Sequence, residues 1–212
     1  MSAEICELLL AQRVVPVLRL ASAELTERAA RCIAAAGFMS VEITLTVPGA
    51  IELIGRLARS SAPGVVVGAG TVLDLEAAQR CVDAGARFVV SPCIVPGMAK
   101  IAHAAGCAAL SGGFTPGEIL AAQREGADMV KVFPASTGGP EHVRALHAVF
   151  PDILLCPTGG ISQQNMEAYF AAGAALVGVG NSIVDQKALE AGDGARATEH
   201  ARRFLHPGKA AG

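Results

Sequence analysis

A short pattern that recurs along the chain constrains the fold more than any other feature. At five places a glycine ends an Ala-rich amphipathic segment and precedes a short apolar run, at Gly37, Gly85, Gly106, Gly126 and Gly173. A glycine in this position is typical of the left-handed residue that closes a helix, and the apolar run that follows predicts a strand. The spacing, about 20 residues or twice that, therefore predicts that helix and strand alternate throughout the chain.

Eight apolar runs have the length of strands, over residues 14–19, 40–44, 65–68, 88–91, 108–110, 129–133, 154–157 and 176–179. The segments between them predict helices over 22–36, 49–59, 74–84, 95–105, 116–125, 141–149 and 165–172, with a tail helix near 195–205. N-cap residues are expected at Ser22, Asp74, Thr115 and Ser162.

Eight strand and helix units in a chain of 212 residues predict an α/β fold, a closed (β/α)₈ TIM barrel, with residues 3–12 as an extra N-terminal helix across one end. An open doubly wound sheet is the alternative, disfavoured because no G-x-G-x-x-G follows the first strand. The length also allows two domains, but no linker divides the chain, so we expect one barrel domain over residues 1–212. The Gly/Ala-rich tail after His206 is expected to be loose.

Charge and hydropathy exclude several classes of protein. The net charge is −2 and no Lys/Arg-rich run occurs, which argues against nucleic acid as a partner. Gly, Pro or charged residues interrupt every apolar stretch well before the roughly 20 residues of a membrane helix, so no membrane partner is expected. Acidic residues near the start, in place of a basic signal region, favour a cytoplasmic location. The six cysteines lack the spacing of a zinc site and are expected to be reduced.

Lys131 lies in the apolar segment Met129 to Pro134. Holding an ammonium group among apolar side chains is costly, and burial favours the neutral amine that can attack a carbonyl and form a Schiff base. The alternative is a lysine whose stem packs in the strand while its charged end reaches water. Lys131 alone does not decide between these interpretations.

Polar residues gather near the ends of several predicted strands, where barrels carry their active sites. Alternation along each strand groups Arg19 with Val15 and Val17, Glu42 with Thr44, Thr71 with Val67 and Ala69, Lys131 with Met129 and Phe133, and Thr158 with Leu154 and Cys156. We therefore expect Arg19, Glu42, Thr44, Thr71, Lys131 and Thr158 to converge on one cavity.

Two of these charges have both a chemical and a structural interpretation. Glu42 could move protons for a Schiff-base lysine, or form a structural salt bridge to Lys131 or Arg19. Arg19 could hold a carboxylate with two hydrogen bonds, or form an ion pair at the rim. Opposite charges that face one pocket strengthen the chemical interpretation of the pair.

Glycine-rich turns after the seventh and eighth strands predict a phosphate site. Gly159 and Gly160 follow the seventh strand, and Gly180, Asn181 and Ser182 follow the eighth. Barrels most often bind phosphate through backbone N–H groups at these two places. In contrast, the five histidines fall on predicted helices or the tail, and Cys93 has no neighbouring His motif, so we interpret them as solvated, capping or packing residues.

Nearly the whole chain resembles the class I 2-keto-3-deoxy-6-phosphogluconate (KDPG) aldolases, a family that includes the 4-hydroxy-2-oxoglutarate (KHG) aldolases. The matching segments are residues 14–19, 41–48, 68–72, 91–92, 131–135 and 157–161. The resemblance implies that Lys131 forms the Schiff base without a metal or cofactor and that Glu42 is the general acid/base. It also implies that Arg19 and Thr71 hold the pyruvate carboxylate, that Pro92 and Thr158 contribute to the substrate pocket, that Gly159 and Gly160 bind phosphate, and that the protein is a homotrimer.

Three positions depart from the family pattern. Thr46 stands where many members have Arg, Asn181 where a phosphate-binding Ser is common, and Ser111 where a proline precedes Gly112. The predicted reaction is cleavage of KDPG to pyruvate and glyceraldehyde 3-phosphate. An aldolase for KHG or for the galactonate epimer of KDPG is the alternative within enzymes, and a barrel that binds a phosphorylated ligand without catalysis is the alternative of another class.

Overall fold

The computed structural model describes residues 2–205, in which eight parallel strands form one sheet. The order β7-β6-β5-β4-β3-β2-β1-β8 follows the chain, apart from the pairing of β1 with β8. All eight predicted strands are confirmed, as β1 (Val14–Leu18), β2 (Ser40–Thr44), β3 (Val66–Gly70), β4 (Phe88–Val90), β5 (Ala108–Gly113), β6 (Met129–Val132), β7 (Leu155–Pro157) and β8 (Val177–Val179).

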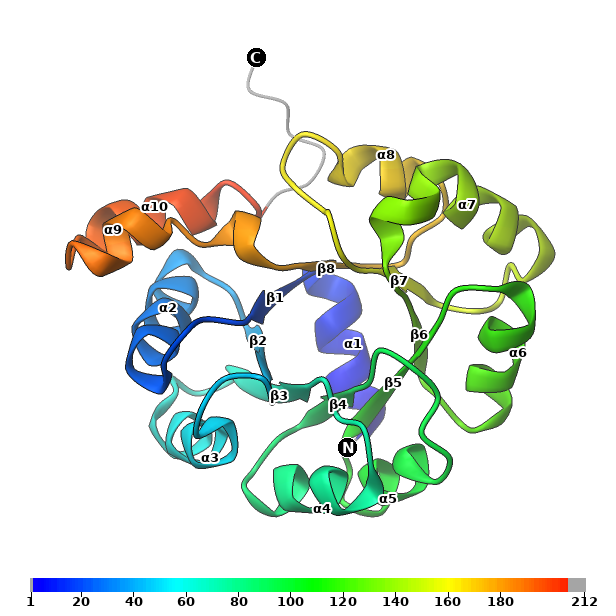
Figure 1. The fold of residues 1–212 in the computed structure, drawn as a ribbon, viewed down its shortest axis with the longest axis horizontal. Coiled ribbons are helices and arrows are strands. Elements are labelled where there is room, and N and C mark those ends of the chain that lie inside the picture. The colour runs from blue at the N-terminus through cyan, green and yellow to red at the C-terminus, as the bar shows by residue number, and fades with distance from the viewer. Residues whose placement is uncertain (1, 206–212) are drawn as a thin grey trace.

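Helices surround this sheet, as Figure 1 shows. They are α2 (Ala23–Ala36), α3 (Ala50–Ser60), α4 (Leu75–Asp83), α5 (Met98–Ala104), α6 (Pro116–Arg124), α7 (Ala135–Val149), α8 (Met166–Ala171), α9 (Gln186–Glu190) and α10 (Gly194–Arg202), with a 3₁₀ turn η1 (Asn181–Ile183) after β8. The alternation confirms the predicted (β/α)₈ barrel. Neither η1 nor α9 was predicted. In the described part of the chain no helix combines the length and apolar character needed to cross a membrane.

The barrel closes between β7 and β8 through a few backbone contacts. Thr158 forms a single parallel bridge with Gly178, and the Ala175 N–H donates to the Leu155 carbonyl at 3.0 Å. A Cβ on Gly178 would collide with the Thr158 hydroxyl, so this glycine allows the two chains to approach. This closure excludes the open sheet, and it brings together the turns that follow β7 and β8.

The interior contains two apolar layers. The larger lies between the sheet and the surrounding helices, and the smaller fills the barrel, where Val15, Phe88 and Met129 pack with Ile5 and Leu9 of helix α1 (Ser2–Gln12). The predicted N-terminal helix is thus confirmed, and it fills the N-terminal end of the barrel. Each such fully buried side chain contributes about 1.5–3 kcal/mol of transfer free energy. The opposite end is left for polar groups.

Local signals explain most of the helix ends. All five repeated glycines have positive φ, from 72° to 112°. Ser22, Asp74 and Thr115 are N-caps as predicted, whereas Ser162 is not, because Asn165 precedes α8 and its side chain accepts the Ser162 N–H at 2.8 Å. The tail after His206 lies outside the described residues, and a single domain over the whole chain stays a prediction.

Helix α7 begins at Ala135 and not near residue 141 as predicted. Its first N–H groups are bonded early, since Ala135 donates to the Thr158 carbonyl and Ser136 donates to the Gly159 carbonyl. A nonhelical Gly139 then kinks the helix before Pro140. The early start places the first turn of α7 directly behind the glycine turn after β7.

Candidate active site

Lys131 on β6 and Glu42 on β2 form an ion pair inside the barrel. The Lys131 Nζ lies 3.8 Å from the Glu42 Oε1. Lys131 is 4% exposed and Glu42 is 2% exposed. At this distance the pair is attracted but not hydrogen-bonded, and Glu42 Oε1 has no hydrogen-bond partner among residues 2–205. A buried, incompletely satisfied pair is an expensive arrangement that is typical of a functional site.

The neighbours of this pair determine which groups can carry a proton. Burial raises the pKa of Glu42, and the attraction of Lys131, then of Arg19, opposes that rise. Cys156 lies beside Lys131 in the strand register, and burial raises the pKa of its thiol to about 12. The thiol therefore stays protonated at neutral pH. The thiol is therefore a poor nucleophile here, and the Lys131 amine and the Glu42 carboxyl are the candidate reactive groups of this cluster.

A glycine on β3 makes room for the Glu42 carboxyl group. Gly70 pairs with Thr44 on β2, and a Cβ on Gly70 would collide with the Glu42 carboxyl group. Gly68, two residues earlier, faces the ring of Phe88 inside the barrel in the same way. Glycines at these two inward positions of β3 therefore leave space for larger side chains from the neighbouring strands.

The predicted orientation of the third strand was therefore wrong. Val67 and Ala69 pack in the outer layer against the helices, because Gly68 and Gly70 take the inward positions. Thr71 nevertheless reaches the mouth of the barrel, since its φ of 59° interrupts the alternation. Its hydroxyl accepts a long hydrogen bond of 3.4 Å from the Arg19 guanidinium. The predicted proximity of Arg19 and Thr71 thus arises from a turn and not from strand alternation.

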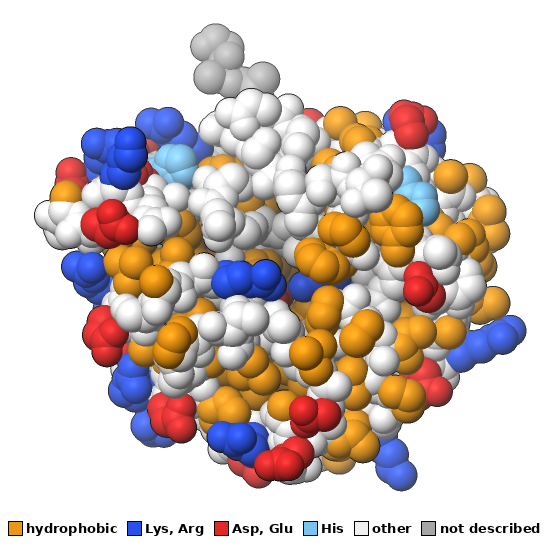
Figure 2. Space-filling view, viewed as in Figure 1, with side chains coloured by type: hydrophobic (Ala, Val, Ile, Leu, Met, Phe, Trp, Pro, Cys, Tyr) orange, Lys and Arg blue, Asp and Glu red, His pale blue; other side chains and the backbone are white. Residues whose placement is uncertain are grey.

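A cavity of about 380 Å³ opens beside Lys131 at the C-terminal ends of β1, β6, β7 and β8. Figure 2 shows basic side chains near the middle of this face, with hydrophobic side chains around them. Eight predicted site residues line the cavity: Arg19, Lys131, Thr158, Gly159, Gly160, Gly180, Asn181 and Ser182. Four others that line it were not predicted as site residues: Val17, Phe133, Ile161 and Ser162. Alternation with Arg19 and Lys131 could have identified the first two.

Four other predicted residues lie off the wall of this cavity. Glu42 does not line the cavity but forms the ion pair with Lys131, which does. Thr71 likewise does not line it and accepts a hydrogen bond from Arg19. Thr44 is fully buried, and its hydroxyl donates to the Leu18 carbonyl at 3.0 Å, which gives it a structural partner. Pro92 lines a neighbouring cavity of about 210 Å³, on whose wall Phe133 also lies.

The two turns that line the cavity after β7 and β8 contain backbone N–H groups without a partner among the described residues. Those of Gly160, Ile161, Asn181 and Ser182 donate to no group within residues 2–205. Gly159 and Gly160 have φ of 96° and 77°, which L side chains rarely adopt. The Ser182 hydroxyl donates to the Ile161 carbonyl at 2.6 Å, whereas its N–H group has no acceptor within residues 2–205. Free N–H groups in two adjacent turns suit an anion.

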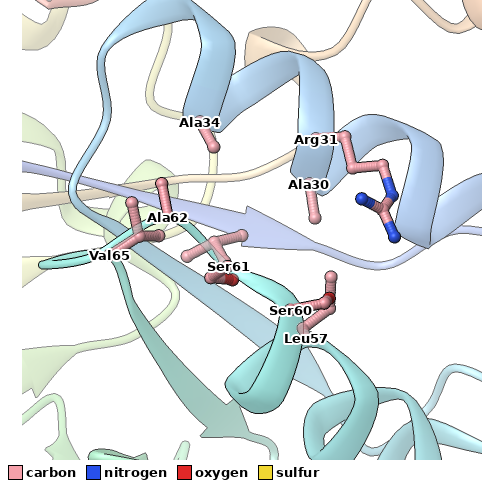
Figure 3. Close-up of a pocket in the computed structure, with 9 residues that line it drawn as sticks. Ala30, Arg31, Ala34, Leu57, Ser60, Ser61, Ala62 and Val65 are labelled. Atoms are coloured by element: carbon pink, nitrogen blue, oxygen red, sulfur yellow. The ribbon is translucent and has the colours of Figure 1, made fainter.

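Another cavity differs in its chemistry. Figure 3 shows this cavity, of about 220 Å³, between α2 and the segment that joins α3 to β3. Its walls carry mainly small residues, and its charged residue, Arg31, forms an ion pair with Glu27 at 2.8 Å. Within residues 2–205 no three His, Cys, Asp or Glu side chains are grouped so that they could hold a metal ion. Within the same residues, Lys131 and Glu42 form the ion pair in which both side chains are buried.

Comparison with known proteins agrees with the resemblance expected from the sequence. Residues 5–200 match the family described as KDPG and KHG aldolase. A probable 2-dehydro-3-deoxy-6-phosphogalactonate aldolase from Rhizobium meliloti is 35% identical over 181 residues, 85% of each chain. The KHG/KDPG aldolase of Escherichia coli K12 is 34% identical over 197 residues, 92% of each chain. Among solved structures, the chain resembles the KDPG aldolase of Legionella pneumophila, crystallised with pyruvate captured as a covalent carbinolamine. The sequences are 30% identical, the TM-score is 0.85, and the match covers 94% of this chain and 97% of that one.

Proposed function

Since this chain belongs to the KDPG and KHG aldolase family and is therefore a lyase, we propose that it cleaves KDPG to pyruvate and glyceraldehyde 3-phosphate through a Schiff base on Lys131. The observation that carries the proposal is the buried pair of Lys131 and Glu42 beside a cavity of substrate size. A carbinolamine with pyruvate in a relative of 30% identity supports the same chemistry.

In this reaction the Lys131 amine attacks the keto carbon and forms a carbinolamine. Glu42 donates a proton as water leaves, and the protonated imine results. The bond between the third and fourth carbons then breaks, its electron pair moves toward the imine nitrogen, and Glu42 takes the proton of the fourth-carbon hydroxyl, which releases the aldehyde. Glu42 returns this proton to the third carbon of the enamine, and water hydrolyses the resulting imine to release pyruvate and the free Lys131 amine. Because burial raises the pKa of Glu42, its carboxyl group can hold a proton for the first step and accept one in the next.

We assign the two ends of the substrate to the two sides of the cavity. Arg19, with Thr71 beside it, is placed to bind the carboxylate of the pyruvate portion. The free N–H groups of the turns after β7 and β8 are placed to bind the phosphate. Thr158 also lines the cavity, and we assign it to the middle portion of the substrate.

The alternatives concern the substrate and the presence of catalysis. The galactonate epimer stays open because a relative of 35% identity carries that name, and KHG stays open because it is in the family's name. KHG has no phosphate, so unpaired N–H groups in the turns after β7 and β8 favour KDPG or its epimer. A barrel that only binds a ligand would gain nothing from a buried amine next to Glu42.

Covalent trapping tests the Schiff base. The chain contains four lysines, Lys100, Lys131, Lys187 and Lys209. Among the three within residues 2–205, Lys131 lies in a strand and the other two lie in helices. Pyruvate with borohydride should add one reduced pyruvate group, and peptide mapping should place it on Lys131. The matched control Lys100→Arg should keep the label, and Lys131→Met should lose it. Label on another lysine would reject the assignment.

Substrate comparison tests the phosphate site. The value of kcat/KM for KDPG should exceed that for its unphosphorylated analogue by at least about tenfold, or roughly 1.4 kcal/mol of transition-state binding. Equal values would mean that the preferred substrate is KHG or another unphosphorylated acid instead of KDPG.

The homotrimer and the cytoplasmic location stay predictions. Sedimentation would test the trimer, and cell fractionation would test the location.

A further inference from the structure

The turn after β8 is held from outside the cavity by a histidine. The Nε2 of His200, on α10, lies 2.8 Å from the carbonyl oxygen of Ser182 in η1. A carbonyl can only accept, so Nε2 must carry the hydrogen and donate. The same serine uses its hydroxyl to bind the Ile161 carbonyl in the turn after β7. Ser182 is thus fixed on two sides, and both contacts leave its N–H group free.

The turn needs such support because it is short. η1 has three residues, and its internal bonds are those from Ile183 to Gly180 and from Val184 to Asn181. A 3₁₀ turn of this length does not hold its N–H groups in one direction by itself. The carbonyl of Ser182 is one of the groups at the end of the turn that require a partner outside it.

Helix α10 is a firm support for this contact. Ala197 and Ala201 of this helix are buried, and so is Phe204, which follows it. The Phe204 ring lies 5.9 Å from the His200 ring and limits its movement. A second contact joins Arg196 to Asp185 at 2.8 Å, beyond the turn, but this arginine is 64% exposed and its ion pair is correspondingly weak. The less exposed contact of the support is therefore the one made by the half-buried His200.

We propose that His200 is a positioning residue for substrate phosphate: its bond to the Ser182 carbonyl aims the N–H groups of Asn181 and Ser182 into the cavity. This rests on the proposed function, because it assumes that the turn binds phosphate. His200 touches no reacting atom, so it controls affinity for the phosphate and leaves the chemistry at Lys131 unchanged. Helix α10 thereby becomes part of the substrate specificity of the enzyme.

The experiment compares two substrates in three variants. His200→Leu removes the donor and replaces the imidazole by an apolar side chain of similar size. His200→Gln keeps an N–H donor at a similar distance from the backbone. In His200→Leu the KM for KDPG should rise about fivefold, the scale of one hydrogen bond, while kcat and the efficiency with the unphosphorylated analogue stay unchanged. His200→Gln should restore most of the affinity for KDPG.

His142→Leu is the matched control. His142 Nε2 also lies 2.8 Å from a backbone carbonyl, that of Phe114, but in the loop after β5. His142→Leu should change kcat/KM for the two substrates by the same factor. Equal loss with both substrates in His200→Leu, or no loss, would overturn the positioning role. A wild-type enzyme without a preference for KDPG would instead reject the phosphate site, and the role of His200 with it.

Discussion

On one side of the cavity the chemical groups are side chains carried by β2 and β6, each of which is paired with its own two neighbouring strands, whereas on the other side they are backbone N–H groups in the turns after β7 and β8. The first side is buried and held by strand register. The second side lies where the barrel closes through a few backbone contacts, and its order depends on glycines and on contacts from α7 and α10.

This difference decides how each side responds to substitution. A side-chain group such as the Glu42 carboxyl is lost when its residue changes. A main-chain group persists through many substitutions, provided that the backbone keeps its conformation. The departure at Asn181 is consistent with this, because a different side chain there still leaves the N–H group in place.

Glu42→Gln should have the largest effect. The amide keeps the size of the side chain but cannot transfer the proton, so turnover should fall by about 10² or more, the scale of a general acid/base. Trapping of pyruvate on Lys131 should slow but not disappear. The exposed Glu76 of α4 supplies the control, because Glu76→Gln should leave turnover unchanged. Near-normal turnover in Glu42→Gln would show that Glu42 is a structural salt-bridge partner and not the general acid/base.

Gly70→Ala should act on the same side without changing a chemical group. The new Cβ would displace the Glu42 carboxyl group, and a misplacement of ~1 Å can lower the rate by up to about 10². We expect turnover to fall about tenfold, with less effect on the KM for substrate. Gly117→Ala is the matched control, because no atom lies within 4 Å of the position of its Cβ. A Gly70→Ala enzyme with wild-type turnover would show that Glu42 tolerates displacement.

Asn181→Ser should have a small effect, because it changes a side chain and keeps the backbone donors. We expect the preference for KDPG over its unphosphorylated analogue to rise roughly twofold, since the smaller hydroxyl relieves crowding at the turn. The measurement is kcat/KM for both substrates in the two enzymes. A tenfold change in either direction would show that the side chain, not the main chain, dominates this side of the cavity.

The pH dependence of stability should show the cost of the buried carboxyl group. Burial raises the folded-state pKa of Glu42 above its ordinary value of 4.5, so the folded state holds this proton more tightly than the unfolded state. Stability from this group is therefore present below pH 4.5 and is lost as the pH rises through the folded-state pKa. Compared with Glu42→Gln, the wild type should lose stability as the pH rises in chemical denaturation. Parallel curves for the two proteins would contradict this.

The orientation of β3 could not be predicted from the sequence. Its residues are apolar or glycine, so alternation gave no sign of which face points inward. Gly68 and Gly70 take the inward positions because Phe88 and Glu42 on the neighbouring strands need the space. The left-handed backbone of Thr71 is equally invisible in the sequence, because it occurs in a residue without glycine's freedom. Both facts depend on neighbours that are distant along the chain.

Local sequence by itself determined the eight strands, the glycine ends of the helices and the common faces that carry Lys131 and Glu42, because turn chemistry and alternation act over a few residues. Only the tertiary structure decided the 3.8 Å separation of that pair, the inward glycines of β3 and the support that His200 gives to the turn after β8. These features arise when closure of the barrel brings distant segments into contact. Their energies come from burial and from hydrogen bonds between those segments, which no local pattern encodes.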